Sequence, residues 1–167
     1  RRFSLQSKVV LMTSAVLIVL PALYFFFYEY DCETIHDRTI HSLFQSVTTR
    51  TAGFNTTDLA AMDESGTAIM IILMLIGGSP GSTAGGMKTA TFAVLFLSAI
   101  TVFSRRNDVQ CFKRRISDET VRSAGAVLFM YLVLFFTSGV IISRVENLPL
   151  LTCLFETSSA IGTVGLS

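Results

Sequence analysis

Two short phrases of threonine, any residue and glycine carry the most specific chemistry in this chain of 167 residues. The first is Thr51-Ala52-Gly53-Phe54, and the second is Thr163-Val164-Gly165-Leu166. Each follows a weakly polar segment that is too short to cross a bilayer. Phrases of this kind are typical of loops in which backbone carbonyls, rather than side chains, face a dehydrated cation. We therefore predict two cation-binding loops, with the ion held by main-chain oxygens.

The residues before the two phrases also match. Leu43-Phe44-Gln45 corresponds to Leu154-Phe155-Glu156 at a spacing of 111, whereas the Thr-x-Gly cores correspond at a spacing of 112. Half-matching pentapeptides also arise by chance in a chain rich in threonine and glycine. A repeat of this length otherwise indicates duplication of a whole membrane unit.

Three polar residues next to the phrases are candidates for supporting them. Glu156 is ionisable at a depth where charge is costly, so it is a functional candidate; we favour bracing of the loop by hydrogen bonds over direct ion binding. Arg50 is expected to buttress the first loop or to repel excess cations. Asn55 begins a glycosylation sequon, but a glycan in the loop would block it.

A glycine-rich stretch is the second informative feature. It comprises Gly77, Gly78, Ser79, Pro80, Gly81, Ser82, Thr83, Ala84, Gly85 and Gly86. Five glycines and a proline cannot hold a continuous helix, so we predict one membrane crossing over 65–104 that is interrupted at 77–86. Irregular backbone at that depth must line a cavity or be buried in protein. A flexible loop below a cation site is a natural gate, and an inert loop between helices is the alternative.

A phosphate-binding loop is the rival interpretation of this stretch. Gly81 and Gly86 have the required spacing, but Met87 intervenes before Lys88 and Thr89. The inserted residue displaces the lysine by one helical position, which disfavours a nucleotide site. Lys88 is expected to face the loop's carbonyls or the inner vestibule.

Other reactive residues form no recognisable site. His36 and His41 lack the neighbours of a metal centre, and the three cysteines are scattered, which predicts unpaired thiols. No arrangement of nucleophile and base, or of paired carboxylates, can be argued. We therefore predict no enzyme and no covalent cofactor.

Composition indicates a membrane protein. Hydrophobic residues make up 51% of the chain and charged residues 15%, with a mean hydropathy of +0.60. Uncharged runs predict spanning helices over 9–28 and 124–142. A signal peptide is the alternative for 9–28, but the run is longer than usual and lacks a small-residue cleavage site.

Basic residues set the predicted orientation. Nine of the thirteen lie before the first span or between the second and third: Arg1, Arg2, Lys8, Arg105, Arg106, Lys113, Arg114, Arg115 and Arg122. The positive-inside rule makes this side cytoplasmic, so 105–121 is expected to be a cytoplasmic basic linker. It is better explained as a topology signal that contacts lipid headgroups than as a partner site. The net charge of +1 indicates no nucleic-acid binding.

The two phrases need short helices to position them. Segments 39–48 and 150–161 are predicted to be half-length helices, the first about 15 Å long, that enter from the outer side. Their C-terminal ends carry partial negative charge and would point at the bilayer centre, which favours cations. The loops 49–55 and 162–167 would then replace water around the ion. K⁺ is easier to dehydrate than Na⁺.

Three motifs together resemble the Trk/Ktr/HKT superfamily of potassium transporters, most closely its Ktr-type membrane subunits. The segment 46–55 resembles that family's third selectivity filter, 77–88 resembles its intramembrane gating loop, and 155–167 resembles its fourth filter. The resemblance implies an all-α, multi-pass subunit in the plasma (inner) membrane, built from helix, pore loop and helix repeats. By this alignment, 1–104 is the third repeat and 122–167 is the first half of the fourth, so we expect a fragment.

The same resemblance implies a function. Four filters would surround one K⁺ pathway, and a homodimer would sit on a cytoplasmic, nucleotide-binding regulatory ring that moves the gating loop. Gly53 and Gly165 match the glycines of potassium-selective members. Two other classes remain. A secondary transporter could bind solute at the broken helix, and a membrane NTPase is disfavoured by Met87.

Overall fold

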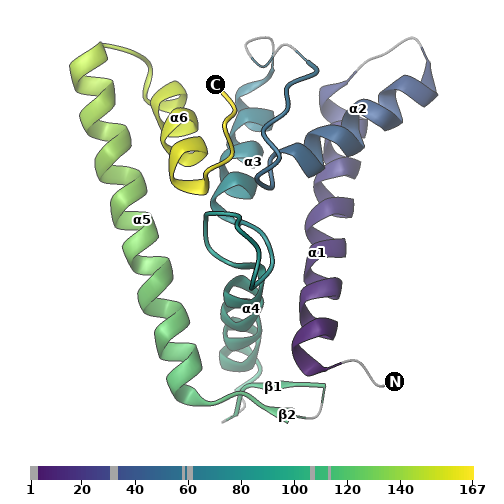
Figure 1. Cartoon of the computed structure of the whole chain (residues 1–167), viewed down its shortest axis with the longest axis vertical. Coiled ribbons are helices and arrows are strands. Elements are labelled where there is room, and N and C mark those ends of the chain that lie inside the picture. The colour runs from purple at the N-terminus through teal and green to yellow at the C-terminus, as the bar shows by residue number, and fades with distance from the viewer. Residues whose placement is uncertain (1–3, 31–33, 58, 60–61, 106–107, 113) are drawn as a thin grey trace.

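The computed structural model describes residues 4–30, 34–57, 59, 62–105, 108–112 and 114–167. About 70% of the described residues are helical and almost none form sheet, which confirms the predicted all-α class (Figure 1). The long helices α1 and α5 stand on either side, and α3 and α4 lie between them with a loop at mid-height (Figure 1).

The first helix, α1 (Leu5–Tyr24), begins earlier than the predicted 9–28 because Ser4 caps it. The Ser4 hydroxyl accepts a hydrogen bond from the backbone N–H of Ser7 at 3.2 Å. Pro21 lies in the last turn, and the helix continues as one π-helical turn, η1 (Phe25–Glu29). A π-helical turn has a wider hydrogen-bond spacing than an α-helix, which accommodates the backbone donor that proline lacks.

The next helix, α2 (Ile35–Thr48), starts four residues before the predicted 39. The charged and polar residues of its first turns lie toward the end of the molecule where α1 finishes (Figure 1). Its inner half carries buried polar side chains: Ser42, Gln45, Ser46 and Thr48.

The predicted interrupted crossing is two helices, α3 (Glu64–Leu75) and α4 (Thr89–Phe103). The non-helical connection, 76–88, extends beyond the predicted 77–86 by one residue at its start and two at its end. Strand-like pairing of Ile76 with Met87 explains the difference, since both residues are extended rather than helical.

The predicted basic linker over 105–121 contains a short hairpin and the start of the next helix. Strands β1 (Gln110–Cys111) and β2 (Arg114–Arg115) form an antiparallel hairpin. Helix α5 (Asp118–Glu146) begins well before the predicted 124, because the Ser117 hydroxyl caps it and acidic residues occupy its first turn. Its 29 residues correspond to about 43 Å of helix.

The last helix, α6 (Leu150–Gly162), closely matches the predicted 150–161. It runs from the end where α5 finishes back toward mid-height, and the chain after it turns toward the same end again (Figure 1). The core lies where α3 and α6 meet, and includes Met70, Met74, Phe155, Val164 and Leu166.

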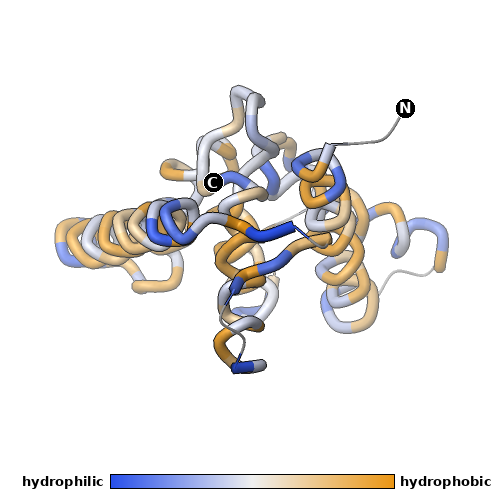
Figure 2. The backbone as a smooth tube through the Cα atoms, turned by 90° about the horizontal axis from the view of Figure 1, so that it is seen from below, coloured by the Kyte–Doolittle hydropathy of each residue, from blue (hydrophilic) through white to orange (hydrophobic). Residues whose placement is uncertain are grey.

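In the described part of the chain, two stretches are long and apolar enough to cross a membrane: Leu5–Glu29 and Asp118–Glu146. Helices α3, α4 and α6 are apolar but shorter. The hairpin and the start of α1 lie at the same end of the molecule, where Lys8 Nζ is 5.7 Å from the centre of the Phe112 ring. Seen from this end, the outer helices are predominantly apolar (Figure 2).

Candidate functional site

The first Thr-x-Gly phrase follows α2 directly. The backbone N–H groups of Ala52 and Gly53 both donate to the carbonyl of Thr48, at 3.2 and 3.1 Å. The Thr48 hydroxyl also donates to the carbonyl of Phe54. Thr48, which is buried at the end of α2, therefore holds the phrase at Ala52, Gly53 and Phe54. The Phe54 carbonyl, one of the predicted ion-binding groups, already accepts a hydrogen bond from the protein.

The second phrase closes α6. The N–H of Val164 donates to the carbonyl of Ser159 at 2.9 Å, and that of Thr163 donates to the carbonyl of Ala160 at 3.1 Å. This pair of bonds is a Schellman ending, in which glycine usually occupies the left-handed position. Here Thr163 occupies it, with φ of 52°, at a cost of about 1–2 kcal/mol.

The two phrases share an alternating backbone. Thr51 and Gly53 have φ of 69° and 71°, and Thr163 and Gly165 have φ of 52° and 89°. Alternation of left-handed and ordinary angles brings successive N–H groups to one side of the chain and carbonyls to the other. Both phrases therefore have a backbone suited to presenting rows of oxygens.

Gly53 packs directly against the second phrase. A Cβ built on Gly53 would lie 1.9 Å from the carbonyl oxygen of Val164 and 3.6 Å from the Cα of Gly165. Only glycine permits this approach. Two phrases that are 112 residues apart in sequence thus lie side by side.

The second phrase is anchored by alternate side chains. Val164 and Leu166 are buried in the core, at 6% and 2% exposure, whereas Thr163, Gly165 and Ser167 are exposed. The exposed residues, with Glu156 and Ser159, line a hollow of about 480 Å³. A cation beside the phrase would meet polar backbone and the Glu156 carboxylate.

The predicted supporting residues have different surroundings. Glu156 is exposed and makes no hydrogen bond within the described part of the chain, so the structure shows no bracing by it. Arg50 reaches back to α1, where its two terminal nitrogens lie 3.5 Å from the carbonyl and hydroxyl of Ser14. Asn55 accepts a hydrogen bond from the Thr57 N–H at 3.2 Å, which forms a local turn.

Polar residues that the sequence motifs did not mark as supporting residues anchor α2, which leads into the first phrase. Ser46 donates to the carbonyl of Ile18 at 2.7 Å, and Gln45 donates to the sulfur of Met70 at 3.1 Å. Thr57 contacts both Gln45 and Tyr30. The sequence signal that could have identified these residues is the series of hydroxyl and amide side chains along 42–49, which is unusual in an apolar chain.

The glycine-rich loop has a closed neck. Backbone N–H groups donate from Gly77 to Met87, from Met87 to Leu75 and from Thr89 to Gly78, at 2.9–3.1 Å. A Cβ on Gly77 would lie 1.8 Å from the carbonyl oxygen of Gly85, so the two sides of the loop touch. The ends of α3 and α4 are thereby joined by main-chain bonds.

Lys88 lies at the base of this loop. Its Nζ donates to the carbonyls of Ser82, at 3.2 Å, and Ala84. The ammonium group thus faces the loop's carbonyls, one of the two surroundings expected from the sequence. Pro80 belongs to the loop's outer turn together with Ser79, whose carbonyl accepts from the backbone and hydroxyl of Ser82.

The loop also reaches the second phrase. The N–H of Gly85 donates to the Thr163 hydroxyl at 2.9 Å. The carbonyl of Met74, in the last turn of α3, would lie 2.4 Å from a Cβ on Gly162. The end of α3 and the end of α6 are therefore in direct contact.

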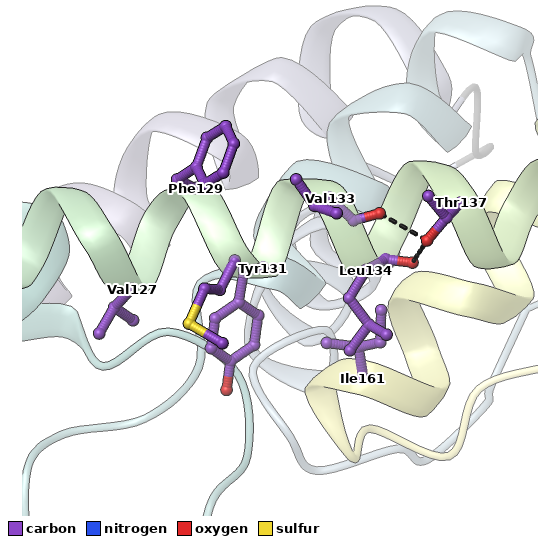
Figure 3. A pocket seen from close by; sticks show the side chains of 8 residues that line it. Val127, Phe129, Tyr131, Val133, Leu134, Thr137 and Ile161 are labelled. Carbon is purple, nitrogen blue, oxygen red and sulfur yellow. Dashed lines mark hydrogen bonds between the residues drawn. The ribbon is translucent and has the colours of Figure 1, made fainter.

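An apolar surface groove is unsuited to a cation. It has a volume of about 660 Å³ and lies between α5 and α6, where Val127, Met130, Leu134 and Ile161 contribute apolar side chains (Figure 3). Thr137 donates its hydroxyl to the carbonyls of Val133 and Leu134 on its own helix. Within the described residues, no cluster of histidine, cysteine, aspartate or glutamate could hold a metal ion.

Comparison with known proteins identifies the family of the chain. The family described as TrkH, cation transport protein, matches residues 1–167. The chain belongs to the TrkH family of cation transport proteins. The resemblance drawn from the sequence motifs is thereby confirmed for the family, whose members are transport proteins and not enzymes.

Individual relatives of this TrkH family chain are potassium uptake proteins by name. Ktr system potassium uptake protein B of Bacillus subtilis is 35% identical over 173 residues, which cover 100% of the chain and 39% of that protein. Potassium/sodium uptake protein NtpJ of Enterococcus hirae is 33% identical, with coverage of 100% and 39%. Ktr system potassium uptake protein D of Bacillus subtilis is 36% identical, with coverage of 99% and 38%. The chain thus spans about two fifths of the length of these curated relatives.

Proposed function

We propose that this chain is part of a potassium-translocating, channel-like pore subunit in the plasma (inner) membrane. The observation that carries the proposal is the packing of Gly53 against the Val164 carbonyl. It supports two filters side by side, formed by Thr51 to Phe54 and Thr163 to Leu166. Backbone carbonyls of these phrases would replace the hydration shell of K⁺.

The electrostatics of the short helices favour a cation. α2 and α6 both end at the phrases, so the partial negative charge of their C-terminal ends lies beside the proposed ion path. Glu156 would add a carboxylate at the open side of the second filter, where it attracts cations rather than bracing the loop. Arg50 would buttress the first filter from behind through Ser14.

The Gly-rich loop would be the gate. It lies at mid-height between α3 and α4 (Figure 1) and contacts the second phrase through Gly85. In this position it would block the path beneath the filters until it moves. A homodimer on a cytoplasmic, nucleotide-binding regulatory ring would supply that movement. The word system in the names of two Ktr relatives supports a partnership with other subunits.

The full-length protein that contains this chain tests the proposal. It would be expressed in bacteria without other potassium uptake systems, and K⁺ and Na⁺ uptake would be measured. Expression should restore growth at low K⁺, and deletion of 77–86 should raise K⁺ flux. Uptake of an organic solute with no independent K⁺ flux would instead favour a secondary transporter with its site at the broken helix.

A further inference from the structure

One side-chain contact joins the two parts of the proposed pore. The N–H of Gly85, in the Gly-rich loop, donates to the Oγ1 of Thr163 at 2.9 Å, across 78 residues of sequence. A Cβ on Gly85 would lie 2.4 Å from this oxygen and 2.6 Å from the Cγ2 of Thr163. The fit is therefore close, and the loop backbone rests on the threonine side chain.

The end of α6 does not need this side chain. A Schellman ending is most easily made by glycine, and a β-branched residue with positive φ is uncommon. Thr163 occupies the position at a conformational cost, and its hydroxyl is used by the loop.

The matching residue of the first phrase behaves differently. Thr51 has the same left-handed backbone, with φ of 69°. Within the described part of the chain, however, its hydroxyl makes no hydrogen bond, to the loop or to any other residue. The hydrogen bond with the loop is thus specific to the second phrase.

We propose that the Thr163 hydroxyl is a latch that holds the Gly-rich loop closed against the second filter. The inference rests on the proposed function of the loop as a gate. Opening requires the Gly85 amide to leave Thr163, so the hydrogen bond stabilises the closed state only. Loss of one such bond should shift the closed-to-open ratio about two- to tenfold. Because coupling is reciprocal, loop position should also alter ion affinity at the second filter.

The test uses the full-length protein and a comparison of valine with serine at position 163. Thr163→Val keeps the branched shape without an acceptor, whereas Thr163→Ser keeps the hydroxyl. Each is combined with an intact loop and with deletion of 77–86, and K⁺ flux is measured where the unsubstituted protein conducts little. Thr51→Val and Thr51→Ser form the matched control pair.

With the loop present, Thr163→Val should conduct about two- to tenfold more than Thr163→Ser, and the difference should vanish when the loop is deleted. The valine-to-serine ratio at Thr51 should be the same with and without the loop. If the valine variant does not fold, Thr163→Gly replaces it, since glycine suits the left-handed backbone.

If the valine-to-serine flux ratio at Thr163 is the same with and without the loop, the latch is wrong, but the gate assignment is unaffected. If loop deletion raises flux but Thr163 and Thr51 behave alike, the gate stands and the latch is wrong. If loop deletion leaves flux unchanged, the gate assignment fails as well.

Discussion

The carboxylate of Glu29 accepts a 2.9 Å hydrogen bond from the backbone N–H of Asp63. This bond joins the end of η1 to the N-cap residue that directly precedes α3, across 34 positions of sequence. Asp63 makes no side-chain cap of its own. Glu29 therefore fixes the start of α3 relative to η1.

Replacement of Glu29 by alanine should destabilise the protein by about 1 kcal/mol, because the Asp63 N–H loses its acceptor. Glu29→Gln should retain most of the stability, since its amide oxygen can still accept. Thermal unfolding of the purified full-length protein in detergent measures both variants. Equal losses for alanine and glutamine would mean that charge, and not the hydrogen bond, is responsible.

A second substitution tests the packing of the same side chain. A Cβ on Gly66 would lie 2.2 Å from the second carboxylate oxygen of Glu29. Gly66→Ala should therefore destabilise the protein when Glu29 is present. In the Glu29→Ala background it should be neutral or stabilising by up to about 1 kcal/mol, because alanine is the better helix former.

Gly53→Ala should abolish K⁺ uptake. The added methyl group would overlap the Val164 carbonyl, and the residue would have to keep a φ of 71°. Gly165→Ala should have a smaller effect, since no atom lies within 4 Å of its Cβ position and only its φ of 89° opposes it. Gly125→Ala in α5 is the control, because space is open there and the backbone is helical. Uptake assays with surface-expression controls rank the three, and equal loss in all would contradict the packing argument.

Gly77→Ala should force the neck of the Gly-rich loop apart, since its Cβ would overlap the Gly85 carbonyl. We expect K⁺ flux to rise toward that of the loop deletion. Gly81→Ala, at the open tip, is the matched control, because it meets only backbone strain at φ of 85°. If Gly81→Ala raises flux as much as Gly77→Ala, general loosening of the loop explains the result and the neck has no special role.

Burial raises the pKa of the Cys111 thiol above its usual range. The thiol therefore stays protonated to higher pH in the folded protein than in the unfolded chain. The stability that the protonated thiol contributes is present below the unfolded pKa and is lost as pH rises through the folded pKa. At mildly alkaline pH, alkylation of Cys111 should be slower in the native protein than after denaturation, in a Cys32→Ser background. A native rate equal to the denatured rate would show that the hairpin does not shield this thiol.

Local and repetitive sequence signals predicted the helices best. The uncharged runs located α1 and α5, and Pro149 with its apolar neighbours located α6 within one residue of its observed end. The lengths of α2 and α5 were underestimated because charged residues such as Asp37 and Asp118 belong to helical turns outside the apolar layer. Hydropathy does not identify those turns, whereas a capping residue such as Ser117 marks where the helix begins.

Contacts between distant segments could not be predicted in the same way. The left-handed backbone angles of Thr51 and Thr163 were not expected, because threonine rarely adopts them. The contact of Gly85 with Thr163 and the cap provided by Glu29 depend on tertiary packing. The hairpin at 110–115 was missed because two-residue strands leave no alternating pattern to recognise.

The paired neck of the Gly-rich loop has a mechanical consequence. Because the Gly77 N–H bonds to Met87 and the Thr89 N–H bonds to Gly78, main-chain hydrogen bonds connect α3 to α4 directly at the neck. The loop projects from this connection, so it can move through a short distance without any shift of the two helices. Residues inserted at the tip would therefore lengthen the loop while the spacing of α3 and α4 stays the same.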